Sequence, residues 1–251
     1  VIVNSAGTAF RFNGSAVSTI SDPDLPAVGW VESFDQYIVY GRLDGEGWGV
    51  SDLADATAYD PLDVASAESD PDPIVYGIRN LREMHLMGKD TIESFYVVGG
   101  GGFPFERAPD GVVEVGLAAK WSVGKIDNRV VFLGNEKGGL SVRMLEGRTP
   151  VRISTPEIDD LLDNAARTNS SWIAEAFAFT YAYAGHAYYV LTVAGLNLTL
   201  QYDCLSRKWQ QRESSPGQAW RVGFSASAYN QIWFGETATG RIMVPNRGVH
   251  T

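Results

Sequence analysis

A short apolar segment, in most copies closed by a glycine, occurs five times along the chain. The copies begin at Tyr37, Glu83, Arg129, Ala187 and Gln231, so successive starts are 46, 46, 58 and 44 residues apart. Repeats in the forties that contain strands and little helix are typical of a β-propeller, in which each repeat forms one four-stranded blade. The spacing therefore predicts an all-β, propeller-like chain.

Each repeat divides into strands separated by turn residues. The strands predicted for the second to fifth repeats are 74–79, 83–87, 92–97 and 112–115; 121–126, 129–133, 140–145 and 150–153; 176–183, 187–193, 197–202 and 208–211; 220–226, 231–234 and 241–244. The first repeat runs from residue 27 to about 63. Strands at 2–3, 9–12 and 17–20 belong to an earlier blade. We expect four full blades and two partial ones, in a single domain over residues 1–251 that is the middle part of a longer protein.

The longest spacing contains an insertion, for which a short helix over residues 155–166 is predicted. Thr155 can cap the helix, Pro156 occupies its first position and acidic residues fill its first turn. One apolar stripe at helical spacing comprises Ile158, Leu161, Leu162 and Ala165. We interpret the segment as a connector on a blade edge, and a partner-docking helix is the alternative.

Composition excludes several classes of protein. The net charge of −10 and the pI near 4.8 disfavour tight nucleic-acid binding, which depends on neutralising phosphates. A surface that faces DNA without holding it is compatible with this charge, because like charges repel. The single cysteine, Cys204, excludes an intrachain disulfide. The longest apolar runs are shorter than the ~18 residues of a membrane helix, so we expect no membrane association.

Acidic residues concentrate between residues 49 and 78, where the chain has seven carboxylates and no lysine or arginine. The seven are Asp52, Asp55, Asp60, Asp63, Glu68, Asp70 and Asp72. The ligand spacing of a calcium loop is absent. We interpret the stretch as an acidic loop that faces solvent, a partner or a channel.

The sequence predicts no catalytic, cofactor-binding or metal-ligating residue. His85, His186 and His250 are scattered, and we interpret His85 as a buried, hydrogen-bonded histidine within its strand. The glycines at 99–102 lack the Gly-Lys-Ser/Thr that completes a phosphate loop, so we expect a flexible connection between strands. Cys204 lies in the turn of residues 202–209 and is interpreted as an unreactive thiol.

Several motifs, taken in order, resemble one family. They are Gly49-Val50-Ser51-Asp52-Leu53, Tyr59-Asp60-Pro61-Leu62-Asp63, the acidic run 65–72, Gly88-Lys89-Asp90-Thr91-Ile92-Glu93-Ser94-Phe95, Phe103-Pro104-Phe105-Glu106-Arg107, Val115-Gly116-Leu117-Ala118-Ala119 and Val151-Arg152-Ile153-Ser154-Thr155. The chain resembles, over residues 34–246, the packaged-DNA stabilisation protein of short-tailed phages, also called the tail hub or nozzle protein. Members of this family are longer at both ends.

The resemblance implies a non-enzymatic structural role in the virion tail, in a protein made in the host cytoplasm. It implies a ring of copies, typically six, attached to the portal adaptor and to other tail proteins. Such a ring extends and helps close the DNA channel, so that the packaged genome is retained while double-stranded DNA can pass without tight binding.

Two other functions compete with this one. A glycan-binding or carbohydrate-active propeller would stack sugar rings on exposed aromatic faces such as Trp30, Trp48 or Trp121, and would pair carboxylates across a central pocket. A kelch-type interaction module is the weaker alternative, favoured by Tyr202-Asp203 and Trp209 in the fourth repeat alone.

Overall fold

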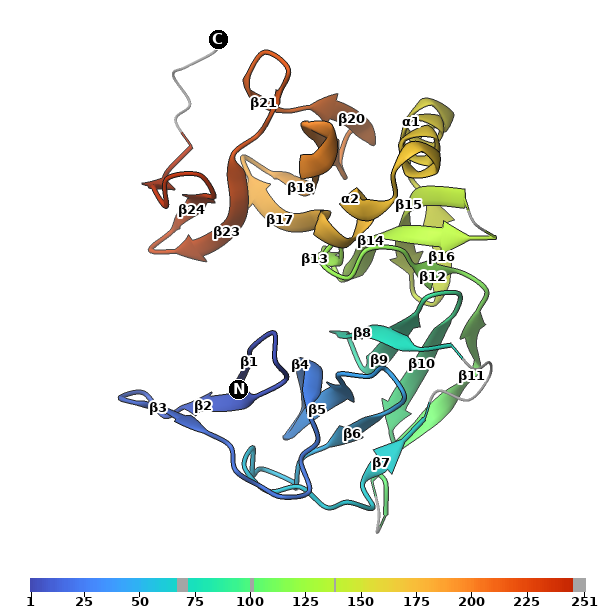
Figure 1. The fold of residues 1–251 in the computed structure, drawn as a ribbon, viewed down its shortest axis with the longest axis vertical. Helices are drawn as coiled ribbons and strands as arrows, with labels where there is room; N and C mark the ends of the chain where they lie inside the picture. Colours follow the sequence, from blue (N-terminus) through green and yellow to red (C-terminus); the bar gives the residue numbers. More distant parts are fainter. Residues whose placement is uncertain (67–71, 100–101, 138, 246–251) are drawn as a thin grey trace. The chain divides into compact units, whose positions relative to one another are not determined.

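The computed structural model describes residues 1–66, 72–99, 102–137 and 139–245 (Figure 1). These residues form two compact units, Val1–Leu117 and Ala118–Thr251. Each unit consists of antiparallel sheets, and the four strands of each full blade pair in chain order. This meander of neighbouring strands is the blade that the sequence repeats predict.

The first unit contains three sheets (Figure 1). Their strands are β1 (Ile2–Val3), β2 (Ala9–Phe12) and β3 (Val17–Thr19); β4 (Val28–Phe34), β5 (Tyr37–Arg42), β6 (Trp48–Val50) and β7 (Val64–Ala65); and β8 (Ile74–Asn80), β9 (Glu83–Gly88), β10 (Ile92–Val97) and β11 (Phe105–Val113). The short β12 (Gly116–Leu117) ends the unit. The second and third sheets are full blades, and the first has three strands.

Strands of the second unit form two four-stranded runs, a small hairpin and a three-stranded sheet. They are β13 (Gly124–Ile126), β14 (Arg129–Glu136), β15 (Gly139–Glu146) and β16 (Thr149–Arg152); β17 (Phe177–Tyr183), β18 (His186–Val193), β19 (Leu198–Asp203) and β20 (Lys208–Gln211); β21 (Glu213–Ser215) and β22 (Gln218–Ala219); and β23 (Val222–Ala228), β24 (Gln231–Glu236) and β25 (Ile242–Met243). The expected four full and two partial blades are therefore present in the described chain.

Each unit has its own hydrophobic core between sheets. In the first unit Trp48 is fully buried and makes edge-to-face contacts with Phe95, Phe103 and Phe105, at ring-centroid distances of 4.9–5.3 Å. In the second unit the core includes Leu133 and Val142 of one sheet and Leu191 of the next. Large flat side chains suit this position, because they fill the space between packed sheets.

The insertion folds as α1 (Pro156–Thr168), followed by α2 (Ser171–Glu175) and, after β18, a 3₁₀ turn (Ala194–Leu196). Ile158, Leu162 and Ala165 of α1 pack on the core, and Asp163 accepts a hydrogen bond from the Leu140 amide at 2.7 Å. These contacts favour the connector interpretation. Leu161, which the predicted stripe includes, is 45% exposed.

Two local predictions were wrong. Thr155 occupies the N-cap position of α1, but its side chain makes no capping hydrogen bond; the Ser154 hydroxyl instead bonds the Asp159 carboxylate of the first turn. The strand expected at 112–115 is the end of β11, which begins at Phe105 and pairs with β10 through a register shift between Glu93 and Phe95. Such a bulge allows one long strand to follow a bent partner.

Candidate docking surfaces

The acidic stretch lies in loops that surround β7, and its carboxylates have different roles. Asp55 accepts hydrogen bonds from the amide and hydroxyl of Thr57, and Asp60 accepts one from the Leu62 amide. The hydrogen bond from the Thr57 hydroxyl lowers the pKa of Asp55 most, and the bond from the Thr57 amide lowers it further. Asp52 is exposed to solvent. Glu68 and Asp70 lie outside the described residues.

Asp63 is half-buried and directly precedes β7. Burial raises its pKa, and the neighbouring charges of Asp60 and Asp52 raise it further. Asp52, Asp60 and Asp63 therefore concentrate negative charge at one place on the first unit. This local field supports the interpretation of an acidic, partner-facing or channel-facing loop, which stays a prediction.

Asp72 is used within the fold. Its carboxylate accepts hydrogen bonds from the amides of Lys89, Asp90 and Thr91, each at 2.8 Å, and from the Thr91 hydroxyl at 3.1 Å. These contacts tie the entry to β8 to the turn between β9 and β10. Asp72 thus differs from the other described members of the acidic stretch, because its carboxylate is held by four fixed hydrogen-bond donors from one turn.

The three-stranded sheet at the start of the chain has one packed face and one open face. Val3 and Ala9 are opposite each other in register and belong to the core shared with β4 and β5. Alternation places Phe10 and Phe12 on the other face, where they are opposite Ile2 and Val17. Ile2, Phe12 and Val17 are each 56–61% exposed.

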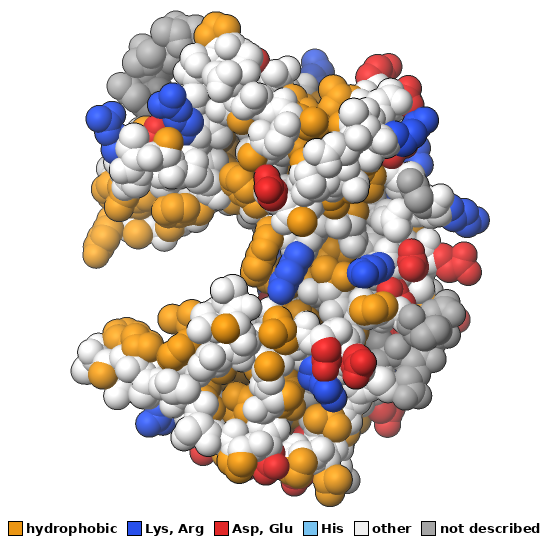
Figure 2. All heavy atoms as spheres, in the orientation of Figure 1, with side chains coloured by type: hydrophobic (Ala, Val, Ile, Leu, Met, Phe, Trp, Pro, Cys, Tyr) orange, Lys and Arg blue, Asp and Glu red, His pale blue; other side chains and the backbone are white. Residues whose placement is uncertain are grey.

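The three-stranded sheet at the end of the described chain has the same property. Phe234 faces the core with Phe179 and Val190 of the preceding sheet. On the opposite face Phe224, Gly235 and Ile242 lie in one cross-strand row, and the ring of Phe224 covers Gly235. Phe224 and Ile242 are 58% and 69% exposed. Figure 2 shows hydrophobic side chains gathered over both end sheets.

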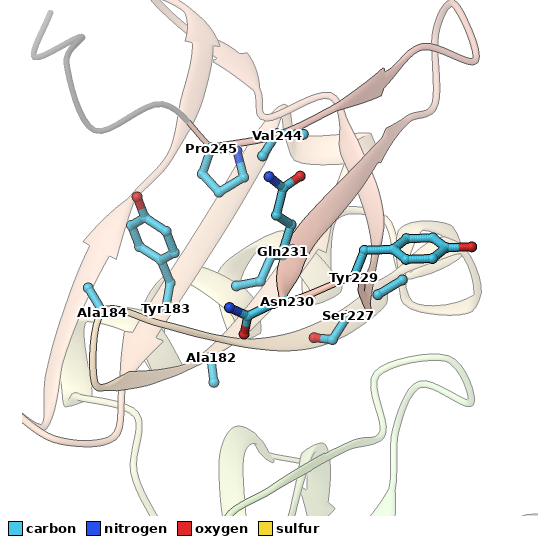
Figure 3. Close-up of a pocket in the computed structure, with 11 residues that line it drawn as sticks. Ala182, Tyr183, Ala184, Ser227, Tyr229, Asn230, Gln231, Val244 and Pro245 are labelled. Atoms are coloured by element: carbon cyan, nitrogen blue, oxygen red, sulfur yellow. The ribbon is translucent and has the colours of Figure 1, made fainter.

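A hollow of about 750 Å³ opens between the β17–β18 turn, the β23–β24 turn and the residues after β25 (Figure 3). Tyr183 and Tyr229 stand at the two turns, and Asn230 and Gln231 lie between them. None of the described residues that line the hollow is charged. Tyr229 and Asn230 both have positive φ, as a two-residue type I′ turn requires.

The glycan-binding alternative needs exposed tryptophan rings on which sugars can stack, and the three candidate tryptophans do not provide them. Trp30 and Trp48 are buried core residues. Trp121 is exposed, but the Lys120 ammonium lies 4.9 Å from its ring centroid. The described chain also holds no set of three or more His, Cys, Asp or Glu side chains close enough to bind a metal ion.

His85, His186 and Cys204 have local structural surroundings. His85 is buried and its Nδ1 lies 2.8 Å from the Ser94 hydroxyl, which confirms the sequence interpretation. His186 Nδ1 lies 2.8 Å from Asp203 Oδ2. Burial raises the pKa of the Cys204 thiol to about 11, in agreement with an unreactive thiol. His250 lies outside the described residues.

The kelch-like turn also has a structural explanation. Tyr202 and Trp209 are paired across β19 and β20, with ring centroids 5.1 Å apart, and the Trp209 indole donates to the Ile153 carbonyl at 2.8 Å. Asp203 accepts hydrogen bonds from the Leu205 amide and the Ser206 hydroxyl. These contacts account for the motif through packing within one blade and one hydrogen bond to the preceding blade.

The open faces of the two end sheets are the candidate sites that sequence reasoning did not identify. The alternating apolar pattern of β2 and of β23–β24 looks like that of any blade strand, so it does not show which face has a neighbour. A signal was present in the blade count, because the first and last sheets were predicted to be partial.

The fold resembles that of known structures at low sequence identity. Virginiamycin B lyase from Staphylococcus aureus, in a catalytically inactive form with quinupristin, is 12% identical, with 95% of this chain and 77% of that chain covered and a TM-score of 0.56. A protein assigned as a 6-phosphogluconolactonase from Bacteroides fragilis is 9% identical, with 94% and 75% covered and a TM-score of 0.52. At such identities the likeness shows the fold alone.

Among the described residues, no helix combines the length and hydropathy needed to cross a bilayer.

The search of curated proteins gives no match. The model of one protein family, described as Bacteriophage P22 Gp10, beta-propeller, matches residues 1–246. This match confirms the all-β propeller fold and the family resemblance that the ordered motifs indicate. The chain belongs to this phage DNA-stabilisation family of β-propeller proteins.

Proposed function

We propose that this chain is a structural component of the virion tail of a short-tailed phage, acting in the hub or nozzle below the portal. In this role it extends the DNA channel and helps close it, so that the packaged genome is retained. The family match over residues 1–246 is the observation that carries the proposal.

The proposed mode of action is positional and involves no catalytic step. Copies of the chain, made in the host cytoplasm, form a ring in the tail that contacts the portal adaptor and other tail proteins. Rigid blades suit this role, because sheets packed face to face resist deformation. The open apolar faces of the two end sheets provide surfaces on which contacts with other proteins can form.

Charge supports passage of DNA without capture. The first unit carries 19 acidic and 6 basic residues, for a net charge of −13, and the second carries 11 and 14, for a net charge of +3. A strongly negative wall repels phosphates and offers few cations for counterion release. In this proposal the loops that contain Asp52, Asp60 and Asp63 line the channel or a neighbouring contact.

A complementation experiment tests the role. A phage that lacks this protein is grown with and without the protein supplied in trans, and filled heads are purified. Without it, we expect heads that package DNA and then lose it, measured as nuclease-accessible DNA and as empty particles by electron microscopy. Heads that keep their genome equally well in both cases would contradict the proposal.

A further inference from the structure

Another hollow, of about 430 Å³, lies within the first unit. It is formed by the second sheet and by the connection between β3 and β4. One wall contains Tyr40 of β5 and Val64 of β7, and Pro26 and Pro61 add apolar surface. All of its lining residues lie between positions 24 and 66, so the hollow is built without any residue of the second unit.

The Tyr40 hydroxyl reaches this hollow without a partner. Only 1% of Tyr40 is exposed, and its ring packs edge-to-face on Tyr59 at a centroid distance of 5.5 Å. The phenol extends across β6, since a β-carbon at Gly49 would come within 2.6 Å of the hydroxyl. Gly49 pairs with Val64, so the hydroxyl lies beside the strand that forms the wall. This hydroxyl has no hydrogen bond to any described residue, and a buried side chain of this kind is expected to have a polar partner.

Two carboxylates also line the hollow. Asp24 lies between β3 and β4, and Glu46 lies in the turn between β5 and β6. Neither carboxylate accepts a hydrogen bond or forms an ion pair among the described residues. Arg42 lines the same hollow, but its guanidinium donates to Asp44 at 2.7 Å, and this bond raises the Arg42 pKa more than the charge of Glu46 does. The two open carboxylates therefore leave the hollow with excess negative charge.

These groups match an organic cation with an apolar stem. A metal ion is disfavoured, because the described part of the chain has no set of three or more His, Cys, Asp or Glu side chains close enough to bind one. A primary ammonium has three N–H donors and no acceptor, and the hollow offers three acceptors, on Asp24, Glu46 and Tyr40. Burial raises the pKa of Tyr40, so its hydroxyl stays neutral at neutral pH and can accept a hydrogen bond.

We propose that this hollow binds a primary alkylammonium group, whose charged end contacts Asp24, Glu46 and the Tyr40 hydroxyl. The methylene chain of the ligand lies against the apolar wall, as the stem of a lysine side chain does on other apolar surfaces. A lysine of another protein and a free polyamine both present this group. The first lysine of this chain is Lys89, so the segment that forms the hollow supplies none of its own. The site is independent of the proposed tail role.

Two variants each remove one acceptor. Tyr40→Phe deletes only the hydroxyl, and Glu46→Gln neutralises an exposed carboxylate, so both are expected to fold. Asp35→Asn is the control for charge, because Asp35 is exposed in the β4–β5 turn and does not line the hollow. Tyr37→Phe is the control for the hydroxyl, because Tyr37 lies on the opposite face of the same strand. The melting temperature of each variant checks its fold.

NMR titration of the full chain measures binding of n-butylammonium, spermidine and N-acetyl-lysine methylamide, with n-butanol as the uncharged probe. We expect n-butylammonium to bind wild type and both controls, and n-butanol not to bind. Tyr40→Phe and Glu46→Gln should each bind n-butylammonium at least about fivefold more weakly. Added salt should weaken binding. Tighter binding of the lysine derivative than of spermidine assigns the group to a protein lysine, and the reverse order assigns it to a polyamine.

Three results would overturn the inference. The first is a folded wild type that binds none of the three ammonium probes. The second is equal binding by wild type and both hollow variants, which would mean general attraction to an acidic surface. The third is equal weakening by Asp35→Asn and Glu46→Gln, which would assign the effect to net charge. If the melting temperature of Tyr40→Phe falls, Glu46→Gln alone decides.

Discussion

The carboxylate of Asp72 lies so close to Gly88 that a β-carbon at position 88 would come within 2.1 Å of Asp72 Oδ2. The three amides that follow Gly88 in the chain donate to the same carboxylate. A glycine is therefore required where the carboxylate crosses the end of β9. This pair explains why the motif Gly88-Lys89-Asp90-Thr91 accompanies an aspartate 16 residues earlier.

Gly88→Ala is expected to destabilise the chain by about 1–3 kcal/mol, because the new methyl group displaces the carboxylate from its donors. Asp72→Ala should cost a similar amount, about 1.5–3 kcal/mol, through loss of hydrogen bonds to a charged group. Urea unfolding measures both. In the double variant the two costs should not add, because the clash disappears with the carboxylate. Full additivity would contradict the proposed contact.

Trp30 imposes a similar requirement on two neighbouring strands. A β-carbon at Gly41 would come within 2.1 Å of the indole Nε1, and one at Gly77 within 2.1 Å of Cη2. The indole is thus held between β5 and β8, in the core of the first unit. Because Trp30 is large and buried, its side chain cannot move aside to relieve the overlap with an added β-carbon.

Gly41→Ala and Gly77→Ala are each expected to cost about 3 kcal/mol in the free energy of unfolding, at the upper end of the usual range for overpacking. Gly139→Ala is the control, because a β-carbon there has no neighbour closer than 3.5 Å and the backbone φ is not positive. Urea unfolding followed by tryptophan fluorescence compares the three. Equal stability of Gly41→Ala and Gly139→Ala would show that the indole moves freely.

The sequence predicts the central strands of each blade well. Residues such as Val130, Val131, Phe132 and Leu133 are buried on both faces of their sheet, so they form an uninterrupted apolar run that is visible without the structure. Peripheral strands are harder to predict. The β21–β22 hairpin begins with Glu213-Ser214-Ser215, whose exposed polar residues have no apolar alternation.

Long-range contacts explain the remaining differences. Asp72 looks like one more member of an acidic loop, because its donors are 17–19 residues further along the chain. The bulge between Glu93 and Phe95 is likewise absent from the apolar pattern. Buried Glu93 of β10 forms an ion pair with Arg107 of β11 at 2.8 Å. Arg107 lies before residues 112–115, where the sequence predicts this strand, so the pair was not foreseen.

Asp203 predicts a dependence of stability on pH. Burial acts to raise its pKa, but hydrogen bonds from Ser206, from the Leu205 amide and from His186 outweigh burial, and the pKa is lowered below 3.8. A lowered folded-state pKa means that the carboxylate contributes stability above the unfolded value, and that this contribution is lost as the pH falls through the folded value.

The wild type should therefore lose stability on acidification from pH 5 to pH 3 more steeply than Asp203→Asn, measured as the melting temperature at each pH. Asp60→Asn is a suitable comparison, because Asp60 is exposed and accepts one backbone hydrogen bond. If Asp203→Asn and wild type have parallel profiles over this range, the carboxylate does not stabilise the β19–β20 turn through its charge.

Cys204 offers a chemical measure of how firmly this turn is closed. The thiolate is the reactive form of cysteine, and burial raises the pKa of Cys204 from 9.0 to about 11. At pH 8 the folded chain should therefore react with iodoacetamide about 100-fold more slowly than the chain unfolded in urea. Mass spectrometry over time gives both rates on the single cysteine.

Raising the pH from 8 to 9 should increase the folded-state rate about tenfold, since the thiolate fraction rises in proportion. A folded-state rate equal to that of the unfolded chain would mean that the thiol is fully accessible and that burial does not control its ionisation.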